Sequence, residues 1–196
     1  MSKLYFRYGA MNSGKATHLM QVAYNYEERG MKVILIKPYT DTKGGERLVS
    51  RLGVERKVDF VIYEEDDILE KVKKYKEING DIDCILVDEV QFLKSGQIDN
   101  LFEIAVVLDI PVICYGLRTD FKMQGFEGSI RLLLLAHSIE EMKTICKCGR
   151  KAVLNGRKVN NRFVFEGEQV AIDNVNDVEY ESLCGHCYFK YKKNLY

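Results

Sequence analysis

An apolar run near the start of the chain leads directly into a glycine-rich segment that ends in a lysine. The run is LYFRYG (4–9), and Gly9, Gly14 and Lys15 then fit the spacing G-x-x-x-x-G-K. Apolar residues recur after the lysine at helical spacing, at Leu19, Val22, Ala23 and Tyr26. Between a strand and a helix, the backbone N–H groups of such a loop surround a phosphate and the lysine adds positive charge. The sequence therefore predicts a nucleotide-binding loop of Gly9, Ala10, Met11, Asn12, Ser13, Gly14, Lys15 and Ala16.

Ala16 departs from this pattern, because the position after the lysine usually carries a Ser or Thr hydroxyl that binds Mg²⁺. Thr17 is no substitute, since the next helical residue lies about 100° further round the axis. Mg²⁺ keeps several waters and needs few protein ligands. We therefore expect nucleotide binding to persist through the loop amides and Lys15, with reduced Mg²⁺ affinity and, as a further expectation, reduced turnover.

Short β-branched runs alternate with amphipathic stretches over the first 117 residues. Strands are predicted at 4–9, 32–38, 60–63, 84–89 and 111–117. The intervening helical patterns end at stop signals such as Gly30 and Asn79-Gly80. Continuous apolar strands separated by helices indicate a parallel sheet that is covered on both faces. We predict an α/β fold, a P-loop (RecA-like) parallel sheet flanked by helices, as a nucleotide-binding kinase domain over residues 1–144.

Two adjacent acids, Asp88 and Glu89, end an apolar run in ILVDEVQF (85–92). An Asp at this place in a phosphate-loop protein usually serves Mg²⁺. Successive strand residues point to opposite sides, so one acid can face a metal while the other faces an acceptor. A second carboxylate could remove the proton from an attacking hydroxyl group, so the acid pair favours a kinase. An ATPase could use the same carboxylate on a water molecule. Capping of the following turn is the structural alternative for either acid.

Four of the six cysteines form two close pairs, Cys146 with Cys148 and Cys184 with Cys187. Four thiolates from two turns suit a closed tetrahedral Zn²⁺ site, with His186 as an alternative to Cys187. Unligated thiols remain the alternative, whereas Cys84 and Cys114 lie in apolar runs and fit the core. We predict a small zinc-binding domain over 145–196, in which the metal ties down a long loop (149–183) that covers the acceptor.

The overall charge argues against a polyanionic partner. Lysine plus arginine and aspartate plus glutamate number 29 each, and no long basic block is present, so we expect no nucleic-acid partner. The N-terminus lacks the apolar core of a signal peptide, and no run is long enough to span a bilayer. We expect a cytoplasmic protein without a membrane partner, which agrees with six cysteines used as thiols or metal ligands.

These motifs together resemble the type II, phosphate-loop, zinc-containing thymidine kinases of bacterial type. The resemblance extends over nearly the whole chain and rests on GAMNSGK, YNYEERG, SRLG (50–53), LVDEVQF, CYGLRTDF (114–121), AHSIEEMKTICKCGRKA (136–152), GEQVAI and YESLCGHCY (180–188). It implies transfer of the γ-phosphate of ATP to the 5′-hydroxyl of thymidine, with Mg²⁺ and a structural Zn²⁺. It also implies a homotetramer.

The resemblance assigns roles to individual residues. Glu89 is implied as the general base, Asp88 as the residue that manages Mg²⁺, and Lys15 as a catalytic and triphosphate-binding residue, with Val90 and Gln91 bordering the nucleotide. The residues implied to contact thymidine are Met11, Leu117, Phe121, Phe126, Ile172, Asp173, Asn174, Val175 and Tyr180. Arg47 or Arg51 is a candidate to approach the transferring phosphate. A P-loop ATPase whose zinc ribbon binds a macromolecule remains the alternative function.

Overall fold

The computed structural model describes residues 1–39, 47–49, 53, 55–170 and 178–194. Its elements in the N-terminal part are β1 (Leu4–Tyr8), α1 (Lys15–Glu27), β2 (Val33–Pro38), β3 (Arg47–Val49), β4 (Glu55–Lys57), β5 (Phe60–Ile62), α2 (Ile68–Asn79), β6 (Cys84–Val87), the 3₁₀ turn η1 (Val90–Phe92), α3 (Ser95–Val107), β7 (Val112–Gly116), α4 (Glu127–Leu135) and β8 (Ser138–Glu141). The C-terminal part contains β9 (Thr144–Ile145), β10 (Lys151–Ala152), β11 (Leu154–Val159), β12 (Arg162–Val164), β13 (Val178–Leu183) and α5 (Gly185–Lys192).

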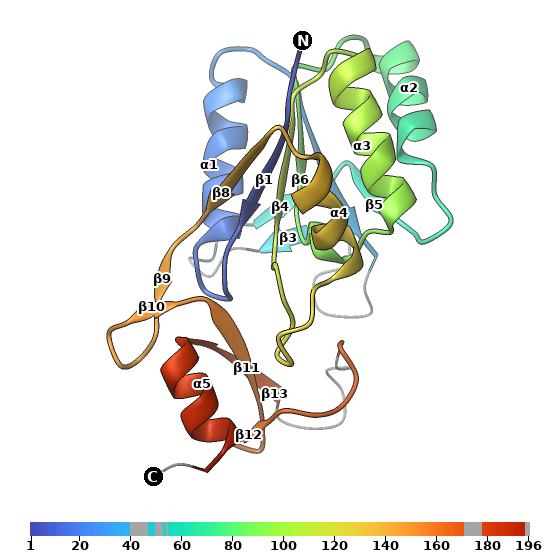
Figure 1. Cartoon of the computed structure of the whole chain (residues 1–196). Helices are drawn as coiled ribbons and strands as arrows, with labels where there is room; N and C mark the ends of the chain where they lie inside the picture. The colour runs from blue at the N-terminus through green and yellow to red at the C-terminus, as the bar shows by residue number, and fades with distance from the viewer. Residues whose placement is uncertain (40–46, 50–52, 54, 171–177, 195–196) are drawn as a thin grey trace.

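A six-stranded parallel sheet in the order β5-β2-β6-β7-β1-β8 forms the centre of the N-terminal part. Alternate residues of the strands β1, β2, β5, β6 and β7 enter two different hydrophobic clusters, as shown by Ile34 and Leu35 of β2. One cluster includes apolar residues of α2, α3 and α4, and the other includes those of α1. Figure 1 shows α1 on one side of the sheet and α2 and α3 on the other. The predicted parallel α/β fold is therefore confirmed.

The sheet topology determines where the phosphate loop and the acid pair meet. β7 lies between β1, which leads into the loop, and β6, which leads into Asp88. All three strands are parallel, so their carboxyl ends meet at one edge of the sheet. The five strands predicted in this half are all present, as β1, β2, β5, β6 and β7.

Sequence patterns did not predict α4, β8 or the β3–β4 hairpin. β8 pairs in parallel with β1 at the edge of the sheet, and its sequence SIEE is only partly buried. An edge strand of this kind lacks the continuous apolar run of a central strand. β8 belongs to the main sheet, whereas β9 pairs with β10, and the domain boundary at residue 144 stays a prediction.

The C-terminal part forms a three-stranded antiparallel sheet, β12-β11-β13, together with α5. Its small core contains Tyr188, Leu183 and Ala152 beside three of the cysteines. In Figure 1 this part lies below the main sheet, on the side to which β1 points. Among the described helices, none is long and apolar enough to cross a membrane.

Candidate active site

The predicted phosphate loop joins β1 to α1, and two of its residues have positive φ. Asn12 has φ 65° and Gly14 has φ 78°, a conformation that glycine adopts without a steric penalty. Gly9 is required for another reason, because a Cβ added there would lie 2.5 Å from the carbonyl oxygen of Met142. The loop therefore packs against the chain that follows β8, and glycine permits this close approach.

The Lys15 side chain folds back over the phosphate loop. Its Nζ donates hydrogen bonds to the carbonyl oxygens of Gly9 and Ala10, at 3.3 and 3.0 Å, and to Ser13 Oγ at 3.3 Å. The ammonium group therefore lies within the loop that the motif assigns to phosphate. A bound phosphate would offer it a charged acceptor in place of neutral ones.

Asp88 lies at the end of β6 and is only 8% exposed. Its backbone N–H donates to the Ile36 carbonyl of β2 at 2.9 Å, which fixes it at the carboxyl edge of the sheet. Burial raises the pKa of Asp88 to about 7, and repulsion from Glu89 adds to the increase. The positive charges of Lys15 and Lys37 oppose it. An ionised Asp88 is therefore costly unless a nearby positive charge compensates it.

Glu89 has a left-handed backbone conformation, φ 49° and ψ 36°, at the turn between β6 and η1. Gln91 Nε2 donates to its carboxylate, and Gln91 Oε1 accepts the Leu117 N–H at 3.0 Å. Gln91 is 2% exposed, and Val90 is completely buried in the main core. Gln91 therefore connects Glu89 to the chain after β7, and Val90 has no exposed side chain to offer a ligand.

The residues predicted to surround the nucleoside lie in several places near this edge. Phe121 lies 3.8 Å below the Arg157 guanidinium, which also approaches the Tyr180 ring at 5.4 Å. Phe126 packs edge-on against Phe92, with ring centroids 5.6 Å apart. Leu117, Phe121 and Phe126 are all buried, whereas Met11 is half-buried. The predicted contacts Ile172, Asp173, Asn174 and Val175 lie outside the described residues.

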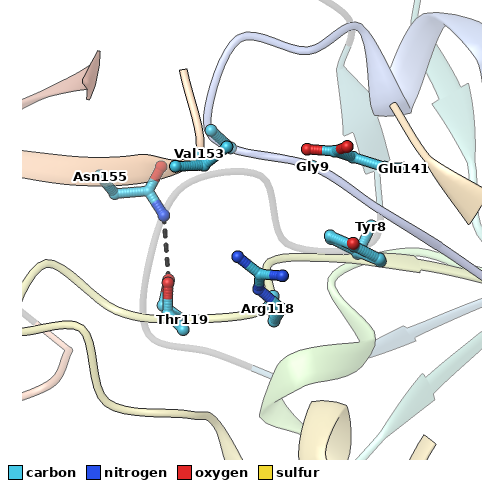
Figure 2. Close-up of a pocket in the computed structure, with 8 residues that line it drawn as sticks. Tyr8, Gly9, Arg118, Thr119, Glu141, Val153 and Asn155 are labelled. Atoms are coloured by element: carbon cyan, nitrogen blue, oxygen red, sulfur yellow. Dashed lines mark hydrogen bonds between the residues drawn. The ribbon is translucent and has the colours of Figure 1, made fainter. Parts of the chain in front are cut away.

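A small cleft beside the phosphate loop connects the two parts of the chain. Figure 2 shows Arg118 between Tyr8 and the Asn155–Thr119 hydrogen bond. The Arg118 guanidinium lies 5.1 Å from the centre of the Tyr8 ring. The cleft is small, and its lining continues into the loop at Gly9 and Ala10.

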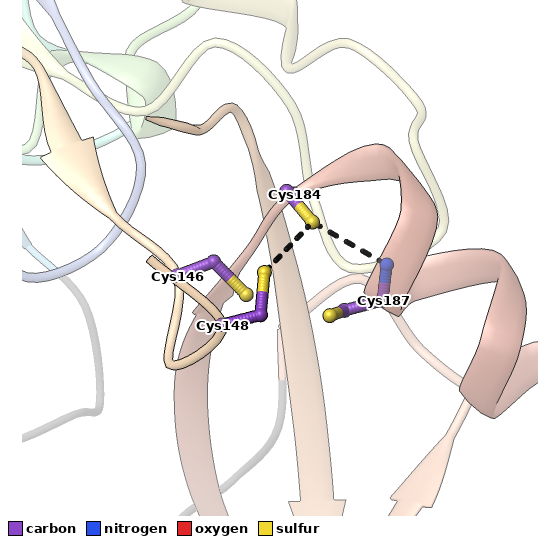
Figure 3. A group of neighbouring side chains, drawn as sticks. All are labelled: Cys146, Cys148, Cys184 and Cys187. Atoms are coloured by element: carbon purple, nitrogen blue, oxygen red, sulfur yellow. Dashed lines mark hydrogen bonds between the residues drawn. The ribbon is translucent and has the colours of Figure 1, made fainter. Parts of the chain in front are cut away.

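The four predicted zinc ligands converge. The Sγ atoms of Cys146, Cys148, Cys184 and Cys187 lie within 4.8 Å of one another. Figure 3 shows the four side chains gathered at one place. Tetrahedral Zn–S bonds of about 2.3 Å require sulfur atoms about 3.8 Å apart, and Cys148 and Cys184 lie 3.6 Å apart. None of the six cysteines forms a disulfide. The donor set and its spacing therefore fit Zn²⁺.

The charges within this cysteine cluster also favour a metal. The Arg150 backbone N–H lowers the pKa of Cys148 to about 6, whereas burial and the neighbouring thiols raise that of Cys187 to about 12. Full deprotonation of four adjacent thiols needs a compensating cation, which a bound divalent ion supplies.

Two histidines and the candidate Arg47 have structural contacts. His137 Nδ1 accepts the Leu4 N–H at 3.0 Å, and His18 contacts the Tyr115 hydroxyl at 2.9 Å. The Arg47 side chain forms an ion pair with Glu55 at 2.8 Å, and Arg51 lies outside the described residues. No catalytic contact of His18, His137 or Arg47 is visible in the described part of the chain.

Sequence reasoning overlooked four buried polar residues near the site: Lys37, Asn155, Arg157 and Ser182. Lys37 could have been noticed in the sequence, because a lysine near the end of the apolar run VILIKP is unusual in a buried strand. The other three lie in a region of mixed polarity, and nothing in the sequence distinguishes them from surface residues.

The fold and this edge of the sheet define a class of protein. A phosphate loop after β1 and an acid pair after β6 at the carboxyl edge of a parallel sheet define a P-loop nucleotide-binding protein, to which this chain adds a four-cysteine module.

Comparison with known proteins identifies the family. The thymidine kinase family model matches residues 2–188. Thymidine kinase of Francisella tularensis subsp. holarctica is 41% identical over 94% of this chain and 95% of its own length. Those of Lactobacillus acidophilus and Enterobacteria phage T4 are 43% and 42% identical, over 96% and 94% of this chain and 97% and 94% of their own lengths. The chain belongs to the thymidine kinase family.

Proposed function

We propose that this chain transfers the γ-phosphate of ATP to the 5′-hydroxyl of thymidine, which yields thymidine monophosphate. The main support is that the family match extends over both the phosphate loop and the adjacent acids Asp88 and Glu89, which parallel strands bring to one edge of the sheet. A protein that only hydrolyses ATP has no need of a wall for a nucleoside, and Phe121 and Phe126 provide buried aromatic surface near that edge.

In this proposal Glu89 accepts the proton of the 5′-hydroxyl as that oxygen attacks the γ-phosphate. The hydrogen bond from Gln91 holds the carboxylate in one orientation, and Gln91 is itself held by the Leu117 N–H. Positioning of this kind limits the motion of the base before the reaction begins. A positioned general base accelerates such transfers by roughly 10² to 10⁴-fold.

Lys15 leaves its contacts with Gly9, Ala10 and Ser13 and stabilises negative charge on the phosphates. The amides of the loop through Ala16 bind the rest of the triphosphate. Asp88 holds Mg²⁺, directly or through water, and this ion supplies charge neutralisation when it is bound. Cys146, Cys148, Cys184 and Cys187 hold a structural Zn²⁺.

Thymidine lies against Leu117, Phe121 and Phe126, with Met11 and Tyr180 at its borders. The family resemblance implies that residues 172–175, which lie outside the described part of the chain, also contact the base. This part of the proposal follows from the family resemblance, and burial of the three wall residues is compatible with a flat, apolar site.

We also propose a homotetramer in the cytoplasm. Exposed apolar side chains on α4, Ile130 at 50% and Leu134 at 71%, offer surface for contact with another copy. Light scattering during size-exclusion chromatography distinguishes a tetramer from smaller forms.

A nucleoside panel tests the proposed reaction. Purified protein is incubated with Mg²⁺ and ATP labelled at the γ-phosphate, together with thymidine, deoxyuridine, deoxycytidine or deoxyadenosine. We expect labelled monophosphate with thymidine and little free phosphate without a nucleoside. ATP hydrolysis that ignores thymidine but increases with DNA or a protein would instead support an ATPase with a macromolecular partner.

A further inference from the structure

The antiparallel pair β11–β13 places two polar residue pairs on the same face of the C-terminal sheet. Asn155 lies opposite Ser182, and Arg157 lies opposite Tyr180. Residues two apart on a strand point to the same face, so the two pairs are neighbouring rungs on one face of the ladder, and the Gly156–Glu181 pair between them points to the other face. Asn155, Arg157 and Ser182 are each no more than 5% exposed. Burial of three polar side chains in so small a sheet requires good partners.

The first rung, Asn155 with Ser182, holds both backbone groups of Met11 in the phosphate loop. Asn155 Oδ1 accepts the Met11 N–H at 2.8 Å, and Ser182 Oγ donates to the Met11 carbonyl. Asn155 also donates from Nδ2 to the Thr119 carbonyl at 2.9 Å, as Figure 2 shows. The Met11 N–H therefore faces the C-terminal sheet, and phosphate must bind to amides elsewhere in the loop.

The second rung, Arg157 with Tyr180, contacts a different part of the site. Arg157 Nε donates to the Tyr180 hydroxyl at 3.0 Å. Its two terminal nitrogens donate to the carbonyl oxygens of Glu168 and Gln169, at 2.7 and 2.8 Å. The guanidinium plane also lies 3.8 Å from the centre of the Phe121 ring. Arg157 therefore joins Phe121 to residues 168 and 169, just before the segment predicted to cover the base.

We propose that the β11–β13 ladder positions both substrates, with Asn155 and Ser182 as positioning residues for the nucleotide loop and Arg157 as the positioning residue for the nucleoside wall. The nucleoside half of this proposal rests on the proposed function, whereas the nucleotide half rests on the phosphate loop alone. Because both rungs belong to one pair of strands, the relative placement of phosphate donor and acceptor is set by a single rigid element.

Arg157 is suited to this position because of its shape as well as its charge. The planar guanidinium carries five N–H donors and stacks on an aromatic face, and three of those donors meet three different acceptors here. Lysine has a similar charge but cannot contact these acceptors and cover Phe121 at once. Arg157→Lys therefore removes the planar guanidinium and its set of three hydrogen bonds, and it retains the positive charge.

Separate binding measurements on the zinc-loaded, full-length protein test the division between the rungs. Isothermal titration gives the Kd of Mg-ADP and the Kd of thymidine for Ser182→Ala and Arg157→Lys. Loss of one buried hydrogen bond changes binding by roughly 5- to 50-fold. We expect Ser182→Ala to weaken ADP by that factor and thymidine less, and Arg157→Lys to weaken thymidine and leave ADP within about three-fold of wild type.

Two control variants distinguish positioning from general damage. Ser182→Thr retains a hydroxyl and should restore ADP binding. Lys158→Met lies on the opposite face of β11, where Lys158 pairs with Glu181, and should leave both Kd values unchanged. Zinc content and melting temperature are measured for every variant. If Arg157→Lys does not fold, Arg157→Gln provides a planar donor group of smaller size for the same comparison.

Equal effects of both rung variants on ADP and thymidine, or no effect of either, would overturn the proposal. Met11 is also a predicted neighbour of the base, so the deciding quantity is the ratio of the two Kd changes in each variant. Failure of wild-type protein to bind thymidine would contradict the proposed function, and the ADP measurements would still decide the role of the first rung.

Discussion

Gln91 donates a hydrogen bond from Nε2 to the carboxylate of Glu89, two residues earlier in the chain. Its Oε1 accepts the Leu117 N–H at 3.0 Å, so the same amide group links the end of β6 to the chain after β7. The orientation of the proposed base therefore depends on two neighbouring strands.

Replacement of Glu89 by Gln tests the role of this carboxylate. The amide is similar in shape but cannot accept the proton of the 5′-hydroxyl, so we expect kcat to fall by roughly 10² to 10⁴-fold. The Kd of Mg-ADP should stay within about three-fold. Glu103→Gln on the exposed side of α3 serves as the control, and undiminished turnover in Glu89→Gln would remove Glu89 from the base role.

Gly116→Ala tests the packing behind that base. An added Cβ would lie 2.5 Å from Gln91 Oε1 and 2.9 Å from Val90 Cγ1, both of which are buried. We expect a loss of about 1–3 kcal/mol of stability and a reduced kcat, because Gln91 must shift away from Glu89. Gly96→Ala in α3 meets nothing within 4 Å and should be neutral or slightly stabilising. Equal behaviour of the two variants in thermal melts and kinetics would contradict this account.

Ala16→Ser restores the hydroxyl that phosphate loops usually carry after the lysine. Ala16 lies in the first turn of α1, directly after Lys15. We expect half-maximal activity at a Mg²⁺ concentration several-fold lower than in the chain with Ala16, because a protein oxygen replaces a water ligand. Thr17→Ala should leave the Mg²⁺ dependence unchanged. An unaltered dependence in Ala16→Ser would show that the missing hydroxyl has no cost here.

Asp88→Asn should stabilise the protein without nucleotide or Mg²⁺ at high pH. Burial, with repulsion from Glu89, raises the pKa of Asp88 from 3.8 to about 7 in the folded state. Folding therefore favours the protonated form. The resulting stability is complete below about pH 4 and is lost as the pH rises to about 7.

In denaturant titrations, we thus expect the free energy of unfolding of Asp88→Asn to exceed that of wild type by roughly 4 kcal/mol at pH 8 and to match it near pH 4. Asp81→Asn is the control, because the Asp81 side chain is 89% exposed. A stability difference that does not grow between these pH values would contradict the cost of burying this charge.

Cys148→Ser tests the metal module. Because a hydroxyl replaces one of four thiolate ligands, zinc per chain should fall from about one to well below one, with a lower melting temperature. Cys84→Ala should retain zinc, since Cys84 lies in β6, far along the chain from the cluster. Wild-type protein that folds with far less than one zinc per chain would exclude a structural role for the metal.

Local signals in the sequence were sufficient for the parallel core and the motifs. The runs that form β1, β2, β6 and β7 are apolar because these strands are buried on both faces, and the alternation with helices predicted the layers. The glycine and lysine spacing, the acid pair and the two cysteine pairs could also be predicted, because each is a contiguous pattern whose chemistry needs particular residue types.

The sequence by itself thus determined the fold class, the phosphate loop and the convergence of four thiols, since short-range periodicity and residue chemistry specify them. Only the tertiary structure decided three sets of contacts. Gln91 donates a hydrogen bond to Glu89, and Asn155 and Ser182 form hydrogen bonds with the backbone of Met11. The Arg157 guanidinium stacks on the Phe121 ring. The contacts of Met11 join residues 144 and 171 positions apart in the chain, and Gln91 reaches Leu117 from 26 positions away. Their geometry depends on strand register and burial, which no local pattern in the chain contains.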